Sequence, residues 1–144
     1  HNQQFNICII FIPYKCNTYM SMLASITNPI RTNQPSITSL FEFVKYTINS
    51  YLATKVVFMN EMSELAVAHG YHWDTIRMYL AEDNRIGLSH MQVPGPDGHY
   101  GFGGGCFPKD TTAWVKYAAK LGVNLNVLKS AIKKNVLLRL QKPK

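Results

Sequence analysis

The sequence lacks the features of several large classes of protein. No run approaches the length of about eighteen apolar residues that a membrane span requires, since the longest apolar-rich stretch, residues 5–13, is short and interrupted by Asn6. That stretch also lacks the basic region that precedes the apolar core of a signal peptide. The 3 cysteines are an odd number and too few for a disulfide framework. These absences predict a protein outside the membrane in a reducing compartment, and we expect it to be cytoplasmic.

Acidic residues are scarce and unevenly placed. The chain has 15 Lys+Arg against 8 Asp+Glu, which gives a formal net charge of +7. No acidic residue follows Asp110, whereas basic residues continue to Lys144. A basic segment of this kind can bind nucleic acid, an acidic membrane surface or a phosphorylated ligand, although it is more often a solvated helix face. Because residues 116–144 hold one aromatic residue, Tyr117, and no nucleic-acid motif, we expect no nucleic-acid partner. The absence of a membrane span likewise predicts no membrane partner.

The rest of the composition indicates a globular chain with a mainly α fold. Hydrophobic residues make up 47% and charged residues 16% of the 144 residues, which fits one domain. Residues 1–38 read as an N-terminal extension, with a strand-like run at 5–12 and an irregular linker rich in Thr, Asn, Ser and Pro. Residues 39–140 read as a helical domain and residues 141–144 as a tail. There is no alternation of strands and helices and no internal repeat.

One helix is expected to be unusually long. Ser39 and Glu42 form a capping-box pattern, and neither Pro nor Gly interrupts the chain from there until Gly70, a natural helix terminator. Helical spacing is kept by the apolar residues Val44, Ile48, Leu52, Val56, Met59 and Leu65. The pattern predicts a helix over residues 39–69, roughly 45 Å long. A helix of this length in a small domain suggests a bridge between domains or a subunit interface.

Three shorter helices are expected after the long one. The first fits residues 73–81, with Ile76, Tyr79 and Leu80 on its apolar face, and the other two fit residues 111–121 and 125–140, separated by Gly122. Between the first and second of these lies a loop, residues 82–108, which holds most of the nine glycines.

The end of this loop is the segment most suggestive of chemistry. Four glycines between positions 101 and 105 precede Cys106 and remove side-chain bulk, so a ligand could approach the backbone closely. A helix beginning at 110–111 and the nearby Lys109 would favour the thiolate form of Cys106. The alternative is an ordinary buried cysteine after a flexible loop. The glycines do not follow a strand and lack the G-x-G-x-x-G spacing of a dinucleotide site.

Lys45 and Asn49 lie four residues apart on the long helix and therefore share a face. Both could donate hydrogen bonds to an oxyanion, but solvated surface residues would show the same pattern. His69 and His72 are close in sequence, yet Gly70 separates them from a helical register and no cysteine pair accompanies them, so we expect no metal site.

Three segments together resemble the central domain of the UDP-glucose/GDP-mannose dehydrogenase family. They are residues 42–61, residues 83–87 (Asp-Asn-Arg-Ile-Gly) and residues 101–110 (Gly-Phe-Gly-Gly-Gly-Cys-Phe-Pro-Lys-Asp), and they occur in the family's order. Residues 89–95 make the chain more similar to the UDP-glucose branch than to the mannose branches. The resemblance covers about residues 38–135, roughly two thirds of the chain.

The resemblance implies a role for several residues in an NAD-dependent, two-step oxidation of the sugar C6 alcohol. Cys106 matches the nucleophile, which holds the aldehyde as a thiohemiacetal and then the acid as a thioester. Lys45 and Asn49 match the groups that stabilise the oxyanion and position water. Asp110 matches the carboxylate that assists the proton and water steps, and Lys109 is expected to contact NAD.

The resemblance also implies substrate contacts. Arg85 matches an arginine that reaches the sugar nucleotide of a neighbouring subunit. Phe102, Gly103, Gly104 and Gly105 match the loop that lines the sugar site, and the expected substrate is UDP-glucose.

The sequence departs from the family in what it does not contain. It has no G-x-G-x-x-G and no recognisable uridine-binding domain. We therefore expect a central-domain fragment that carries the nucleophile but is separated from the family's flanking Rossmann-like domains and inactive alone. The alternative function is a non-catalytic helical dimerisation module, and in either case we expect a homodimer built on the long helix.

Overall fold

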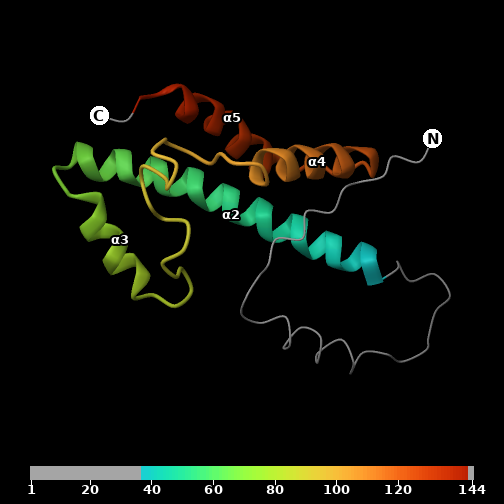
Figure 1. Ribbon diagram of the computed structural model, residues 1–144, viewed down its shortest axis with the longest axis horizontal. Coiled ribbons are helices and arrows are strands. Elements are labelled where there is room, and N and C mark those ends of the chain that lie inside the picture. The colour runs from blue at the N-terminus through green and yellow to red at the C-terminus, as the bar shows by residue number, and fades with distance from the viewer. Residues whose placement is uncertain (1–36, 143–144) are drawn as a thin grey trace. The chain divides into compact units, whose positions relative to one another are not determined.

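A computed structural model describes residues 37–142, which form four α-helices joined by one long loop (Figure 1). The helices are α2 (Ile37–Ala68), α3 (Trp73–Ala81), α4 (Phe107–Lys120) and α5 (Asn126–Leu140). The described residues contain no strand, so the predicted mainly α fold is confirmed. The strand predicted at residues 5–12 and the linker after it lie outside the described residues. Across residues 37–142, no helix combines the length and apolar character that crossing a membrane demands.

The long helix is continuous over 32 residues, without a break near Asn60. It ends as the sequence predicts. Gly70 has a φ of +80°, its N–H bonds to the carbonyl of Val67, and the N–H of Tyr71 bonds to the carbonyl of Ala66 at 2.9 Å. This is the paired hydrogen bonding of a glycine-terminated helix.

The long helix begins two residues before the predicted start at about Ser39. The helix begins at Ile37, so Ser39 lies inside the first turn rather than at its cap. A capping box is a local signal, and it does not prevent the helix from gaining two residues upstream of it.

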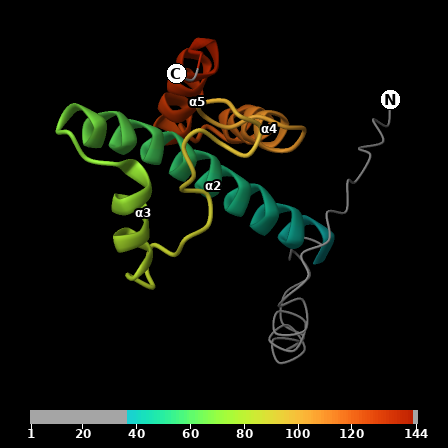
Figure 2. The same cartoon turned by 60° about the vertical axis from the view of Figure 1, so that its left-hand side comes forward.

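The other three helices all pack on α2. Figures 1 and 2 show α3 on one side of α2, with α4 and α5 on the other. The loop of residues 82–106 leaves α3, passes along α2 and returns to the start of α4. Residues far apart in sequence therefore meet along the middle of α2.

Only part of the apolar set that predicts the helix is buried: Met59 is in the core and Val56 packs against it. Val44, Ile48 and Leu65 are exposed, whereas Ala53 and Val57 are buried. Small and polar residues share the buried positions of the helix, among them Ser50, Asn60 and Ser63. Close packing on two sides requires small side chains, so the large apolar residues of α2 are left toward solvent.

Two hydrophobic clusters hold the helices together. One joins Ala53 and Val57 of α2 to Ala131 and Leu138 of α5, with Phe102 of the loop between them. The other groups Met59, Ala66, Trp73 and Met91. In this second cluster the indole N–H of Trp73 donates to the carbonyl oxygen of Met91 at 2.9 Å, which ties the loop to α3.

The helix that follows Cys106 begins four residues earlier than predicted, at Phe107 instead of Thr111. The prediction failed because proline usually marks a helix boundary, but Pro108 falls in the first turn of α4, where its missing N–H needs no partner. α5 begins at Asn126, one residue later than predicted. Gly122, with a φ of +74°, ends α4 as expected.

Candidate active site

Asp110 is the centre of a polar cluster between α2 and α4. Its side chain is 1% exposed, and it lies in the first turn of α4. The Asn49 side-chain amide, on α2, donates to Asp110 Oδ2 at 2.7 Å. The Lys45 ammonium, one turn earlier on α2, lies 3.7 Å from the same oxygen. The predicted pairing of Lys45 with Asn49 on one face is therefore confirmed, and the face is directed toward Asp110.

The second oxygen of the carboxylate is differently placed. Asp110 Oδ1 is buried and has no hydrogen-bond partner among the described residues. The nearest cation is the Lys109 ammonium at 3.8 Å, which is beyond hydrogen-bonding distance and more than half exposed. A buried carboxylate oxygen without a donor is costly. Its hydrogen-bonding capacity is therefore unmet within the described residues.

Cys106 lies one helical turn before Asp110. It is the N-cap residue of α4, and its carbonyl accepts the Asp110 N–H at 2.8 Å. Residues four apart at a helix start lie on the same face, so Cys106 and Asp110 share one face of the first turn of α4. The thiol is partly exposed and forms no disulfide. The backbone contact of Cys106 with Asp110 thus places a thiol-bearing residue beside a carboxylate, a carboxamide and an ammonium that come from two helices.

The glycine loop forms one wall of a hollow of about 600 Å³. Gly101, Phe102, Gly103 and Gly104 line it, whereas Gly105 does not. The opposite wall comes from residues 88–97 and Arg77. Cys106 and Asp110 are not in its walls, although Phe107, next to Cys106, is. The lining of the hollow therefore comes no nearer to Cys106 in the sequence than its neighbour Phe107.

His90 is an unusual member of this wall. It has a φ of 63°, a left-handed conformation that non-glycine residues rarely adopt, and its ring lies 5.7 Å from the ring of Phe107. Partial burial, and secondarily the charge of Lys55, lower the pKa of the imidazole below 6.5. The neutral ring that results can both donate and accept a hydrogen bond at neutral pH.

Arg85 lies apart from this group of residues. Its guanidinium is 88% exposed and binds Asp83 through two bonds, of 2.9 Å and 2.6 Å. This pairing lowers the pKa of Asp83 and raises that of Arg85. Arg85 lines no part of the hollow. If it contacts a sugar nucleotide, that molecule would have to lie outside the hollow, against the exposed guanidinium.

Sequence reasoning missed three buried polar residues that fix the loop. The Lys55 ammonium donates to the carbonyls of Ile86 and Gly87 at 2.8 Å and 3.0 Å, and burial lowers the pKa of this lysine. Asn60 and Asn135 bind the backbone of residues 101 and 102. The sequence could have indicated the burial of these three residues, since each lies three or four residues along a helix from a buried apolar residue.

Among residues 37–142, no group of three His, Cys, Asp or Glu side chains is arranged to hold a metal ion.

Comparison with known proteins gives this arrangement a context. Residues 41–136 match the model of the UDP-glucose/GDP-mannose dehydrogenase family, central domain. UDP-glucose 6-dehydrogenase YwqF of Bacillus subtilis is 37% identical over 94 residues, which are 65% of this chain and 20% of that protein. UDP-glucose 6-dehydrogenase of Rickettsia typhi is 40% identical over 96 residues, 67% of this chain and 21% of that protein.

The solved structures agree. A UDP-glucose dehydrogenase from the hyperthermophilic archaeon Pyrobaculum islandicum superposes with a TM-score of 0.57 at 34% sequence identity, over 66% of this chain and 21% of that one. The chain thus spans about a fifth of the length of the relatives it matches.

Proposed function

Because the chain belongs to the UDP-glucose/GDP-mannose dehydrogenase family, we propose that it supplies the central domain of a UDP-glucose 6-dehydrogenase. In this proposal it carries the cysteine that binds the sugar during the oxidation of its C6 alcohol to a carboxylate. The observation that supports it best is the contact of Asn49 and Lys45 with Asp110, one turn after Cys106.

The cluster suits chemistry at a carbonyl carbon. The Cys106 sulfur attacks the C6 aldehyde and forms a thiohemiacetal, while Lys45 and Asn49 are close enough to the site to donate to the oxyanion. After oxidation to the thioester, water attacks the acyl carbon, and the Asp110 carboxylate accepts a proton from that water. The C–S bond breaks, the acid leaves and the thiol is restored.

The two oxidations require a hydride acceptor, which is NAD in this proposal. The residues described here do not by themselves fit a dinucleotide: residues 37–142 contain no strand, and the sequence has no glycine fingerprint of the Rossmann type. Lys109 is exposed at the start of α4 and is the one residue of this chain that we propose as a contact to the cofactor. None of the bond-forming and bond-breaking steps above passes through the cofactor.

A chimera tests the proposal directly. Residues 41–136 of this chain would replace the matching segment of the B. subtilis relative, and formation of reduced NAD from UDP-glucose would be followed by absorbance. We expect turnover from the chimera and none above the blank from its Cys106→Ser variant, because a hydroxyl without a dedicated base is a poor nucleophile. A folded chimera without activity, or a Cys106→Ser variant as active as its parent, would contradict the proposal.

A second candidate function, a helical dimerisation module, is favoured by a separate observation. Val44, Tyr51, Phe58 and Leu65 repeat every seven residues along α2 and are 39–60% exposed. Apolar residues at this spacing lie on one face of a helix and commonly pack against a second helix. We propose that this stripe is the surface through which two copies associate.

A further inference from the structure

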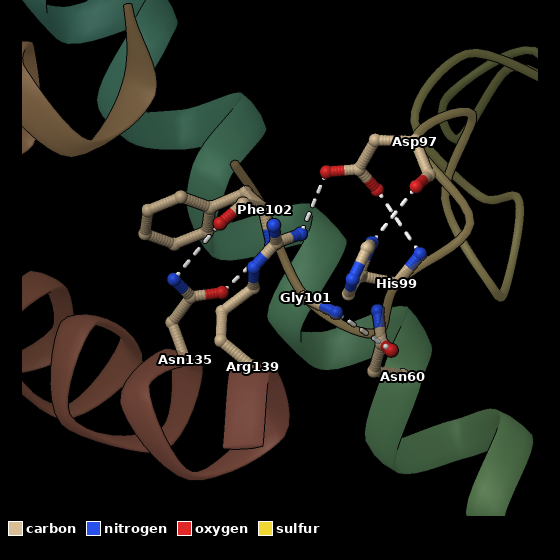
Figure 3. Close-up of polar contacts among 7 residues, drawn as sticks. All are labelled: Asn60, Asp97, His99, Gly101, Phe102, Asn135 and Arg139. Carbon is tan, nitrogen blue, oxygen red and sulfur yellow. Dashed lines mark hydrogen bonds and ion pairs between the residues drawn. The ribbon is translucent and has the colours of Figure 1, made fainter. Parts of the chain in front are cut away.

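Several polar side chains outside the Asp110 cluster grip the loop that leads to Cys106 (Figure 3). We propose that Asn60 and Asn135 are positioning residues, which hold residues 101 and 102 in the conformation that brings Cys106 to the start of α4. The inference rests on the proposed function, since it gives Cys106 a task that requires fixed geometry. Neither asparagine contacts the reacting groups, so each acts through the loop.

Asn135 of α5 satisfies both backbone polar groups of one loop residue. The N–H of Phe102 donates to Asn135 Oδ1 at 2.7 Å, and Asn135 Nδ2 donates to the carbonyl of Phe102 at 3.0 Å. Asn135 is 7% exposed and Phe102 5%. Buried backbone groups need partners, and here one carboxamide provides both, much as a neighbouring strand would. The interaction joins residues 33 positions apart.

Asn60 of α2 holds the preceding residue. Its Oδ1 accepts the N–H of Gly101 at 3.1 Å, and its Nδ2 donates to the carbonyl of Val56 at 2.8 Å, one turn back in the same helix. The second bond fixes which end of the carboxamide faces the loop. Two successive loop N–H groups are therefore bound by two different helices, so the loop backbone cannot move away from either helix without losing a buried hydrogen bond.

The surroundings of Gly101 independently show that the loop packs closely against Asn135. It has a φ of +72°, and a Cβ built on it would overlap Oδ1 of Asn135 and lie 3.2 Å from Cβ of Leu138.

Gly103 is similarly enclosed, since a Cβ there would lie 2.8 Å from Asp97 Oδ2 and 2.9 Å from the Arg139 guanidinium. By contrast, a Cβ on Gly104 or Gly105 would meet nothing within 4 Å. The glycines before the cysteine thus differ: Gly101 and Gly103 leave room for neighbouring side chains, whereas Gly104 and Gly105 have free space where a Cβ would stand.

The side chain of Phe102 connects the fixed loop backbone to the start of α4. Its ring packs edge-on against the ring of Phe107, with centroids 6.1 Å apart and planes at 86°. Phe107 is the first residue of α4 and the neighbour of Cys106. Fixing the backbone of Phe102 therefore fixes the ring that lies against the helix start.

The test measures the loop and the cysteine in the 144-residue chain itself. Asn135→Leu removes both bonds and keeps the branched shape of the side chain, and Asn126→Ala, on the exposed side of the same helix, is the matched control. We expect the Asn135→Leu variant to exchange the amide hydrogens of residues 101 and 102 at least about tenfold faster while α2 keeps its protection. We also expect iodoacetamide to alkylate Cys106 at least about fivefold faster, as the released loop exposes the thiol.

Cys8 and Cys16, resolved by peptide mapping, provide the internal reference for these rates. If Asn135→Leu does not fold, Asn135→Asp keeps the acceptor for the Phe102 N–H but loses the donor, and a smaller change in the same direction is expected. Loop amides as protected as in the parent, with a Cys106 rate within twofold, would overturn the inference. Because neither readout requires dehydrogenase activity, this failure is distinct from an inactive chimera, which would contradict the proposed function instead.

Discussion

At the scale of single residues, the candidate site depends on contacts between α2 and α4 that no local pattern specifies. The glycines and the expected helix start were enough to single out Cys106. By contrast, Lys45 and Asn49 had the same spacing as two solvated residues, and only the family resemblance favoured them. Asn49 and Asp110 are 61 positions apart in the sequence. Their hydrogen bond therefore depends on how the helices pack, which no local pattern shows.

Asn135 illustrates the same limit. Its role depends on the backbone of Phe102, and a polar residue inside a helical pattern does not tell which loop will return to it. Its burial could be guessed from its spacing to Ala131 and Leu138, but its partner could not.

The Lys45 ammonium gives a prediction at this scale. In the active chimera, Lys45→Ala should lower kcat about 10²–10³-fold, the cost of losing one donor to an oxyanion. The side chain is 40% exposed and its nearest carboxylate oxygen is 3.7 Å away, so stability should change little. Steady-state kinetics and a melting curve separate the two effects, with Lys116→Ala on the exposed side of α4 as control. Retention of kcat within threefold would remove Lys45 from the chemistry.

The pair between Asp97 and Arg139 gives a pH-dependent prediction. The Arg139 guanidinium, 2.7 Å from Asp97 Oδ2, holds the pKa of that carboxyl below 3.8, helped by the N–H of His99. The folded state therefore binds this proton more weakly than the unfolded state does. The stabilisation is fully present above pH 3.8 and is lost as the pH falls through the lowered pKa.

Melting temperatures of the parent and of Asp97→Asn should therefore differ by a constant amount near neutral pH and converge below pH 3.8. In an Arg139→Gln background the same substitution should show little of this convergence, because the partner is gone. An equal pH dependence in both backgrounds would contradict the assignment.

At the scale of elements, helix ends were predicted best where a glycine had to take a left-handed conformation. Gly70 and Gly122 end α2 and α4 at the expected places. The helix starts were predicted less well, since Pro108 is compatible both with a boundary and with a first turn. The apolar spacing of α2 did not tell which of its residues would be buried, because the sequence does not show that the helix is covered from two sides by close-packed neighbours.

Gly70 allows a test of the element that separates α2 from α3. Gly70→Ala should lower the free energy of unfolding by about 1 kcal/mol, since an L-residue is disfavoured in the left-handed region. A Cβ at this position would meet nothing within 4 Å, so the loss is conformational rather than steric. Urea denaturation measures it. Gly105→Ala is the control, because its φ is not left-handed and its Cβ is equally free, and it should change stability by less than about 0.5 kcal/mol.

At the scale of the whole molecule, the exposed stripe on α2 predicts association. Tyr51 and Phe58, at the middle of the stripe, are 60% and 51% exposed, and a second copy of α2 would cover them. Light scattering at tens of micromolar should give the mass of a dimer for the parent and of a monomer for Phe58→Glu. Glu42→Lys, an exposed charge change on the opposite side of α2, should remain dimeric. A monomeric parent would exclude the stripe as an interface.

The last prediction concerns what the cluster around Cys106 can do without other parts of an enzyme. The 144-residue chain alone should show no NAD-dependent turnover of UDP-glucose. It brings a nucleophile and its polar partners together, but residues 37–142 offer no strand on which a dinucleotide fold could be built, and no glycine fingerprint occurs in the sequence. Holding two substrates in reacting geometry lowers the activation free energy of well-oriented reactions by about 7–11 kcal/mol, and this lowering would be missing here.

Incubation of the purified chain with UDP-glucose and NAD⁺, followed by absorbance of the reduced cofactor, provides the measurement, and the active chimera is the positive control. The cysteine should nevertheless react with small reagents, because Cys106 is partly exposed and forms no disulfide. Alkylation of Cys106 without turnover would separate the two contributions: the helical domain makes the nucleophile accessible, and binding of both substrates elsewhere supplies the rate. Sustained turnover by the isolated chain would show instead that residues 37–142, or those before them, position both ligands unaided.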